Sequence, residues 1–259
     1  MYKGNSIRSG IQDGQFFFGC FSNMSSPIPV QIAAYTGYDF VMLDHEHSPA
    51  SFQNAVDCIN AAQGSEAEIW VRVPANDKAY IKRILDSGAH GIMCPMVNNA
   101  EDARRLVSYC MFPPHGVRGV APNLCRHTIF GIKRDEYMAN YERHVSIMAQ
   151  IETREAVDNI DAIVATEGLE LFFIGPFDLS ADLGVAGQFG HETMKAAVAK
   201  VEASVKKAGK FLATILLPGQ DARALRERGY SLIIAGSDVA MLRTVLTDQY
   251  KALAAARAS

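Results

Sequence analysis

Eight short apolar segments, separated by helical patterns, constrain what this chain can fold into. They are rich in Val, Ile, Phe and Leu and are bounded by Gly or polar residues, which is the pattern of β-strands. The segments cover residues 15–21, 38–43, 68–73, 91–96, 145–151, 169–174, 211–217 and 231–235. Most are nearly continuous apolar runs, which is typical of parallel strands buried on both faces.

The stretches between the strands carry helical patterns. Helices are predicted over residues 51–62, 79–86, 98–109, 154–166, 191–207, 221–228 and 238–256. Strands that alternate with helices form a parallel sheet, and eight such units indicate a closed α/β structure, the (β/α)8 TIM barrel, rather than an open sheet. Because one such barrel takes about 250 residues, we predict a single domain over residues 1–259.

Composition and charge exclude several classes of function. The formal net charge of −3 gives no attraction to nucleic acid or to an anionic membrane surface. No apolar run approaches the ~18 residues of a membrane span, and the first residues lack the apolar core of a signal peptide. The five cysteines show no C-x-x-C spacing. We therefore expect a cytoplasmic protein without nucleic-acid or membrane partners.

Polar and charged residues gather at the carboxyl ends of several predicted strands. They are Asp44 to His47 after the second strand, Arg72 in the third, Gln150 and Glu152 at the end of the fifth, and Asp178 and Ser180 after the sixth. A buried strand should not end in such groups unless they satisfy one another or a ligand. Because the carboxyl ends of barrel strands carry the chemistry, we predict an active site there.

Glu152 and Asp178 are candidate ligands for one hard divalent cation. Mg²⁺ favours one or two carboxylates and completes its coordination with water and substrate oxygens. The alternative is that each carboxylate caps a helix or pairs with an arginine. Thr153 and Ser180 stand beside them and are the expected helix N-caps, which favours the metal role.

His47 is the candidate general base or proton shuttle, because imidazole titrates near neutral pH. Asp44 is close enough in sequence to orient it. The alternative is a metal ligand or a structural histidine. His45 is expected to face away, and Glu46 is as suited to stabilising the fold as to catalysis.

Arg72 stands inside an apolar strand, where a guanidinium needs a carboxylate or an oxyanion as partner. A salt bridge to Glu46 or Glu152 would satisfy it, with or without a bound oxyanion. A Schiff-base aldolase would need a lysine on a strand. We predict every lysine in a helix or loop except Lys210, at the entry of the seventh strand, so the imine route is disfavoured.

The turn after the eighth strand has two interpretations. The amides that follow Gly236 and Ser237 could bind an anion at a helix start. The simpler interpretation, which we prefer, is a tight turn in which Ser237 or Asp238 is the N-cap of the last helix.

Five motifs together resemble one known family. LDHEH, VRVPANDKAYIKRILDSGAHGIMCPMVNNAEDARRLV, PPHGVRGV, QIET and FFIGPFDLSADLG occur in order between Gly14 and Ala240. The chain thereby resembles the HpcH/HpaI family of class II pyruvate aldolases, which includes 4-hydroxy-2-oxoheptanedioate, 2-keto-3-deoxy-L-rhamnonate and 5-keto-4-deoxy-glucarate aldolases.

The resemblance implies a barrel of the phosphoenolpyruvate/pyruvate type that depends on Mg²⁺, Mn²⁺ or Co²⁺. Such an enzyme reversibly cleaves a 4-hydroxy-2-oxo acid into pyruvate, or a close 2-keto acid, and an aldehyde through an enolate. The family also implies a homo-oligomer, a trimer of dimers that exchanges its C-terminal helix between partners.

The resemblance also assigns roles to residues. The metal carboxylates fall on Glu152 and Asp178, and the catalytic base falls on His47 with Asp44 as its dyad partner. Binding of the 2-keto acid falls on Arg72, Gln150 and the loop of Gly175, Pro176, Phe177 and Asp178, whose last two N–H groups would receive the carboxylate.

Two departures from the family pattern concern His45, where relatives carry a small or polar residue, and Ile129, which replaces an arginine. Ile129 belongs to the long connection 112–144, which is expected to be functional because of its length. Ile129 itself is expected to face the acceptor aldehyde, so the identity of that aldehyde is open.

Three other functions remain as alternatives. One is a CoA-ester lyase of the citrate-lyase β type, although no basic, Gly-rich loop for a diphosphate is evident. Oxaloacetate decarboxylation passes through the same enolate and is a candidate side activity. A catalytically silent 2-keto-acid-binding barrel would predict the loss of at least one strand-end group, whereas the full set is present.

Overall fold

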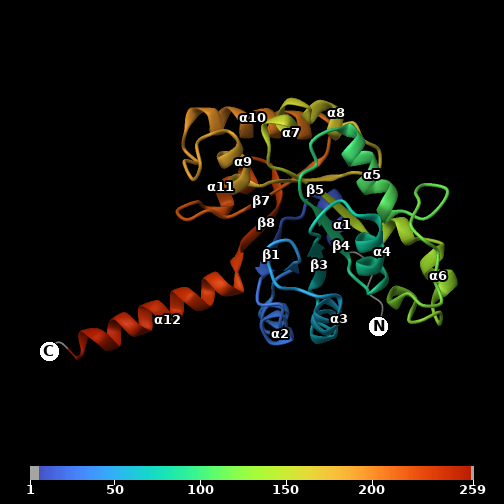
Figure 1. The fold of residues 1–259 in the computed structure, drawn as a ribbon, viewed down its shortest axis with the longest axis horizontal. Helices are drawn as coiled ribbons and strands as arrows, with labels where there is room; N and C mark the ends of the chain where they lie inside the picture. Colours follow the sequence, from blue (N-terminus) through green and yellow to red (C-terminus); the bar gives the residue numbers. More distant parts are fainter. Residues whose placement is uncertain (1–5, 258–259) are drawn as a thin grey trace.

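Eight parallel strands close into a barrel in the computed structural model, which describes residues 6–257 (Figure 1). The predicted (β/α)8 fold is therefore confirmed. Each strand pairs with the next, and β1 pairs with β8. The strands are β1 (Phe17–Ser22), β2 (Phe40–Asp44), β3 (Glu68–Arg72), β4 (Gly91–Cys94), β5 (Ser146–Ile151), β6 (Leu171–Ile174), β7 (Phe211–Ile215) and β8 (Tyr230–Ser237). The predicted domain limits 1–259 include terminal residues that lie outside the described ones.

Helices connect the strands and surround the barrel. Those up to the fifth strand are α1 (Ser6–Gln12), α2 (Pro27–Thr36), α3 (Phe52–Ala61), α4 (Lys78–Asp86), α5 (Ala100–Cys110), η1 (Arg126–Thr128), α6 (Arg134–Met138) and η2 (Tyr141–Arg143). The later ones are α7 (Arg154–Asp158), α8 (Ile160–Val164), α9 (Pro176–Asp182), α10 (Glu192–Lys207), α11 (Ala222–Glu227) and α12 (Asp238–Ala255). The helix predicted over residues 154–166 is split into two at Asn159, whose side chain donates to the backbone oxygen of Asn98 (3.0 Å).

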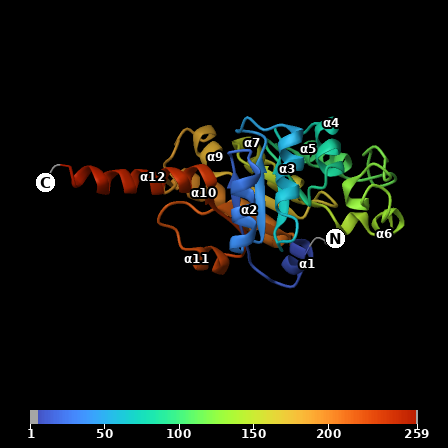
Figure 2. The same ribbon diagram turned by 90° about the horizontal axis from the view of Figure 1, so that it is seen from below.

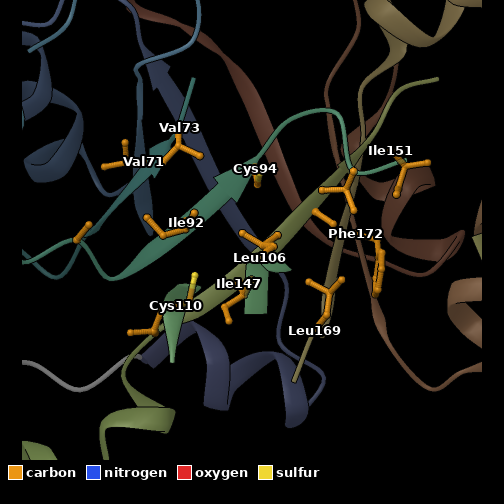
Figure 3. Packing of buried hydrophobic residues seen from close by; sticks show 14 of the residues in the cluster. Val71, Val73, Ile92, Cys94, Leu106, Cys110, Ile147, Ile151, Leu169 and Phe172 are labelled. Atoms are coloured by element: carbon orange, nitrogen blue, oxygen red, sulfur yellow. The ribbon is translucent and has the colours of Figure 1, made fainter. Parts of the chain in front are cut away.

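Two apolar clusters hold the barrel together. The larger one lies between the strands and the helices; Figure 3 shows Ile92 and Ile147, from neighbouring strands, in this cluster with Leu106 of α5. The smaller one fills the barrel interior around Trp70. Gly91 makes room for that ring, because a Cβ there would lie 2.4 Å from the indole. Burial on both faces explains why the strand sequences are continuously apolar.

Helix α1 closes the amino end of the barrel. Its Ile7 and Ile11 are buried in the interior cluster. The backbone N–H of Ile7 donates to Glu68 Oε1 (3.0 Å), and Trp70 Nε1 donates to Oε2 of the same carboxylate (2.9 Å). Helix α1 therefore fills the amino end of the barrel, which leaves the carboxyl ends of the strands as the candidate side for a ligand.

The connection 112–144 also lies at the amino end. His127 is buried, and its Nε2 hydrogen-bonds the oxygen of Ala89 (2.9 Å), just before β4. Ile129 lines a pocket of about 420 Å³ with residues that lead into β3 and β4. We predicted that Ile129 faces the acceptor aldehyde. Within a single barrel this prediction is wrong, because the connection places Ile129 at the amino end, opposite the carboxyl ends of the strands.

Helix α12 leaves the barrel as an arm, and both views agree on this (Figures 1 and 2). None of its residues is buried. Apolar side chains stand exposed along it: Val239, Met241, Leu242, Val245, Leu246, Tyr250 and Leu253. Among the described helices we find none with the length and apolar character that crossing a membrane requires.

Candidate active site

Asp44 and Arg72 lie side by side at the carboxyl ends of two neighbouring strands. They are the last residues of β2 and β3 and are partners in the strand register. Arg72 Nε donates to Asp44 Oδ1 (2.9 Å) and Nη2 donates to Oδ2 (2.8 Å). This two-bond contact is the strongest geometry that a guanidinium and a carboxylate can adopt.

Asp44 collects further hydrogen bonds. Its Oδ1 accepts from the backbone N–H groups of Glu46 (3.1 Å) and His47 (3.2 Å), and its Oδ2 accepts from Asn23 Nδ2 (2.6 Å). Burial by itself would raise the pKa of Asp44, but the hydrogen bonds and charge of Arg72, with the two backbone N–H groups, lower it below its usual value. Asp44 is therefore an ionised anchor that fixes the start of the β2–α3 loop.

Arg72 also contacts Glu46, with 3.2 Å between Nε and Oε2, and its guanidinium lies 4.6 Å from the ring centre of Phe21. Burial raises the pKa of Glu46 to about 7; the nearby charge of Arg72 lowers it, and that of Glu152 raises it. The predicted salt bridge to Glu46 is present, together with the pair to Asp44 that the sequence did not indicate.

His47 is the exposed member of the loop, with 58% of its side chain accessible, and its Nε2 lies 3.7 Å from Glu46 Oε2. Asp44 contacts only the backbone N–H of His47, since its carboxylate is occupied by Arg72 and Asn23. The expected Asp44–His47 dyad therefore does not form between side chains, and Glu46 takes the place beside the imidazole.

His45 faces away from this loop, as predicted. Its Nδ1 hydrogen-bonds the hydroxyl of Tyr80 on α4 (2.8 Å). Burial lowers the pKa of His45 to about 4, so its imidazole is neutral at physiological pH.

Glu152, just beyond β5, is the most enclosed carboxylate of the strand ends apart from Asp44, with 2% of its surface exposed. Its Oε1 accepts from the backbone N–H of Met96 (2.8 Å), and its Oε2 accepts from Gln150 Nε2. Met96 itself has φ +55, in the left-handed region that few non-glycine residues adopt. Burial raises the pKa of Glu152, and the charge of Asp178 adds to this effect.

The residues around Glu152 have the chemistry to bind a small cation. A Cβ on Gly175 would lie 3.0 Å from Glu152 Oε2, so a glycine is required to keep this side open. Gln150 Oε1 is buried without a hydrogen-bond partner. Among residues 6–257 no group of three or more His, Cys, Asp or Glu could hold a metal ion. Glu152 and the exposed Asp178 are the residues that could hold a cation here, and two carboxylates are a number that suits Mg²⁺.

Thr153 and Ser180 were predicted to be helix N-caps, and the structure confirms the first of them. Thr153 caps α7 by accepting from the N–H of Ala156 (3.0 Å). Ser180 is not an N-cap: it lies inside α9, because Pro176 already begins that helix. Gly175 provides no side-chain cap, so the first-turn N–H groups of Phe177 and Asp178 point out of the helix without intrahelical acceptors.

The structure places the lysines where the sequence predicted them. Within the described part of the chain, no lysine lies on a strand. Lys210, just before β7, donates to the oxygen of Thr166 (2.7 Å), at the amino end.

Asn23 and Glu46 are the site residues that sequence reasoning missed or left undecided. Asn23 follows β1 directly, and its place after a strand was the only available signal. Its contact with Asp44 depends on how β1 and β2 lie together, which a linear pattern does not show.

Comparison with known proteins places this geometry in a family. Residues 18–244 match the family described as HpcH/HpaI aldolase/citrate lyase. The chain is 35% identical over 250 residues to a 5-keto-4-deoxy-D-glucarate aldolase of Klebsiella pneumoniae, covering 95% of this chain and 97% of the relative. These matches confirm the resemblance and the predicted class of enzyme, a carbon–carbon lyase.

Two solved structures share the fold of this chain over almost its whole length. A HpcH/HpaI aldolase/citrate lyase family protein from Burkholderia cenocepacia superposes with a TM-score of 0.90 at 33% identity, over 98% of this chain and 99% of the other. A structure described as citrate synthase SbnG superposes with a TM-score of 0.88 at 26% identity, over 98% of this chain and all (100%) of the other.

The paired contact of Arg72 with Asp44 leads to a test of stability. Arg72→Lys should lower the free energy of unfolding by about 1–3 kcal/mol, because one ammonium cannot replace two parallel hydrogen bonds to a buried carboxylate. Urea denaturation measures this. Arg104→Lys, an exposed position on α5, is the matched control and should change little. Equal midpoints for both variants would show that the pair is dispensable.

Proposed function

We propose that this chain, which belongs to the HpcH/HpaI aldolase/citrate lyase family, is a divalent-metal-dependent class II aldolase that cleaves 4-hydroxy-2-oxo acids. The observation that carries the proposal is an excess of negative charge at the barrel mouth. Three carboxylates, those of Asp44, Glu46 and Glu152, interact there with one guanidinium, that of Arg72, and a fourth, that of Asp178, interacts with Glu152. A cation bound between Glu152 and Asp178 would offset this excess.

The bound Mg²⁺, Mn²⁺ or Co²⁺ would act as a Lewis acid that stabilises the negative charge of an enolate. Arg72 contributes to the same end, because Asp44 holds its guanidinium in one orientation. Gln150 and the N–H groups of Phe177 and Asp178 are suited to bind the carboxylate and keto oxygens of the 2-keto acid, as the resemblance implies.

His47 is positioned to remove the proton from the C4 hydroxyl when the C3–C4 bond breaks. Its ring is exposed to the site opening, and Glu46 lies behind it. A carboxylate at that position would stabilise the imidazolium that proton transfer produces. In the reverse direction the protonated His47 returns the proton to the new hydroxyl.

The Klebsiella relative's name indicates one substrate to try first. A 5-keto-4-deoxy-glucarate contains a 4-hydroxy-2-oxo acid unit when it is numbered from its keto end. A panel of such acids, scored by pyruvate formation, with CoA thioesters and oxaloacetate as comparison arms, tests the proposal. Cleavage of a CoA thioester alone would favour the citrate-lyase-type alternative. Binding of 2-keto acids without turnover would favour a silent binding protein.

Metal removal should abolish pyruvate release, and Mg²⁺, Mn²⁺ or Co²⁺ should restore it. Independently of activity, Glu152→Gln should eliminate Mn²⁺ binding in a calorimetric titration, whereas Glu155→Gln, an exposed neighbour on α7, should leave it unchanged. Because burial raises the pKa of Glu152, a proton competes with the metal, and Mn²⁺ affinity should fall as the pH is lowered. Full turnover in the presence of EDTA would refute metal dependence.

His47→Ala should lower kcat for retro-aldol cleavage by ~10²–10⁴-fold, the usual contribution of a positioned acid–base group. The fold should persist because the side chain is exposed. His115→Ala is the control, since this exposed histidine lies at the other end of the barrel. A near-normal rate for His47→Ala would remove the residue from the role of base.

We also propose that α12 docks on a second copy of the chain in a homo-oligomer. Most of the stability of a helix in a protein comes from packing of its apolar face, and Leu242, Leu246 and Tyr250 form an exposed stripe along α12. Helix α2 offers an apolar surface of its own, with Ile28 and Ile32 exposed. Because the resemblance implies exchange of the C-terminal helix, the second copy is the occupant that fits best.

Leu246→Asp should shift the protein to a smaller species in sedimentation velocity, because a carboxylate cannot be buried unpaired in an apolar interface. Thr244→Asp introduces the same charge on the opposite side of α12 and should preserve the assembly. A wild-type protein that sediments as a monomer would contradict the exchange.

A further inference from the structure

Asp238, the first residue of α12, is joined by hydrogen bonds to the loop that follows β1. Its Oδ2 accepts from Ser22 Oγ (2.9 Å) and from the N–H of Met24 (3.2 Å), and its Oδ1 accepts from the N–H of Asn23 (2.8 Å). Ser237 is the residue that caps α12, by accepting from the N–H of Ala240 (3.2 Å). The carboxylate of Asp238 is therefore available to the loop.

The β1–α2 loop has a conformation that its sequence does not favour. Ser25 has φ +50, in the left-handed region that suits glycine, and its hydroxyl is buried without a hydrogen-bond partner. A non-glycine residue persists in this region only where the surroundings hold it. The three bonds to Asp238 are the contacts that hold this loop against the start of α12.

Asn23, in the same loop, is the link to the site. Its backbone N–H is bound by Asp238, and its side-chain Nδ2 donates to Asp44 Oδ2 at 2.6 Å. The same oxygen accepts from Arg72 Nη2 at 2.8 Å. Asn23 therefore shares Oδ2 with Arg72 and contributes to the orientation of the Asp44 carboxylate.

We propose that Asn23 is a positioning residue for the Asp44–Arg72 pair and that Asp238 acts through it, so that the base of the C-terminal arm is coupled to turnover. The proposal rests on the proposed aldolase function. In the proposed mechanism neither Asn23 nor Asp238 touches the substrate. They act by keeping the guanidinium of Arg72 in the orientation that stabilises the enolate.

Asn23→Ala should lower kcat for retro-aldol cleavage about tenfold, because small displacements of a reacting geometry have effects of this size. KM for the keto acid should change less than about threefold, because the groups that bind the ground state remain. Asn140→Ala, an exposed asparagine at the other end of the barrel, is the control. A kcat for Asn23→Ala within twofold of wild type would overturn the proposal.

Asp238→Ala should give a similar fall in kcat, and Asp238→Asn, which keeps one acceptor oxygen, an intermediate one. Asp248→Ala, the same substitution further along α12, should leave kcat unchanged. Because Asp238 acts through Asn23, the double variant Asn23→Ala/Asp238→Ala should be no slower than the slower single variant. A fall equal to the product of the two single effects would show independent action and overturn the coupling.

Sedimentation of each variant distinguishes a loss of assembly from a loss of positioning. Asn23 lies outside α12, so we expect Asn23→Ala to preserve the assembly. If Asp238→Ala fails to assemble, Ser22→Ala replaces it, since this change removes one donor to Asp238 and leaves the helix intact. An unchanged kcat for Ser22→Ala would then count against the coupling. A wild-type protein that cleaves no keto acid would refute the proposed function, whereas active wild type with unaffected variants would refute only this inference.

Discussion

The pair of Asp44 and Arg72 is the contact on which the organisation of the site depends. Two charges at the ends of neighbouring strands are held by two parallel hydrogen bonds, and the strand register places them opposite each other. The pair would be costly to bury if either partner were missing. Because Asp44 also binds the N–H groups of Glu46 and His47, the same carboxylate fixes the start of the β2–α3 loop.

The two ends of the barrel differ because different groups are packed there. Helix α1 and the buried carboxylate of Glu68 fill the amino end, and the long connection after β4 covers the segments that lead into β3 and β4. At the carboxyl end, charged groups from several strands lie near one another. The pKa values of these groups shift in different directions: Arg72 lowers that of Asp44 against the effect of burial, whereas burial raises those of Glu46 and Glu152.

The arm α12 extends this arrangement beyond a single barrel. Its apolar stripe is exposed in the single chain, and its first residue is bound to the loop that contacts Asp44 through Asn23. The proposed coupling of the arm to turnover therefore depends on a few short hydrogen bonds. This explains why Asp238 serves the loop while Ser237 caps the helix.

The sequence by itself determined the barrel, its eight strands and the set of strand-end residues, because continuous apolar runs and polar strand ends are local patterns. It also indicated that His45 and His47 have separate roles. Tertiary structure decided which groups pair: Arg72 with Asp44, Glu46 beside His47, and Ile129 at the far end of the barrel. The physical reason is that partners of a buried charge are chosen by strand register and loop path, and these bring together residues that no periodicity along the chain connects.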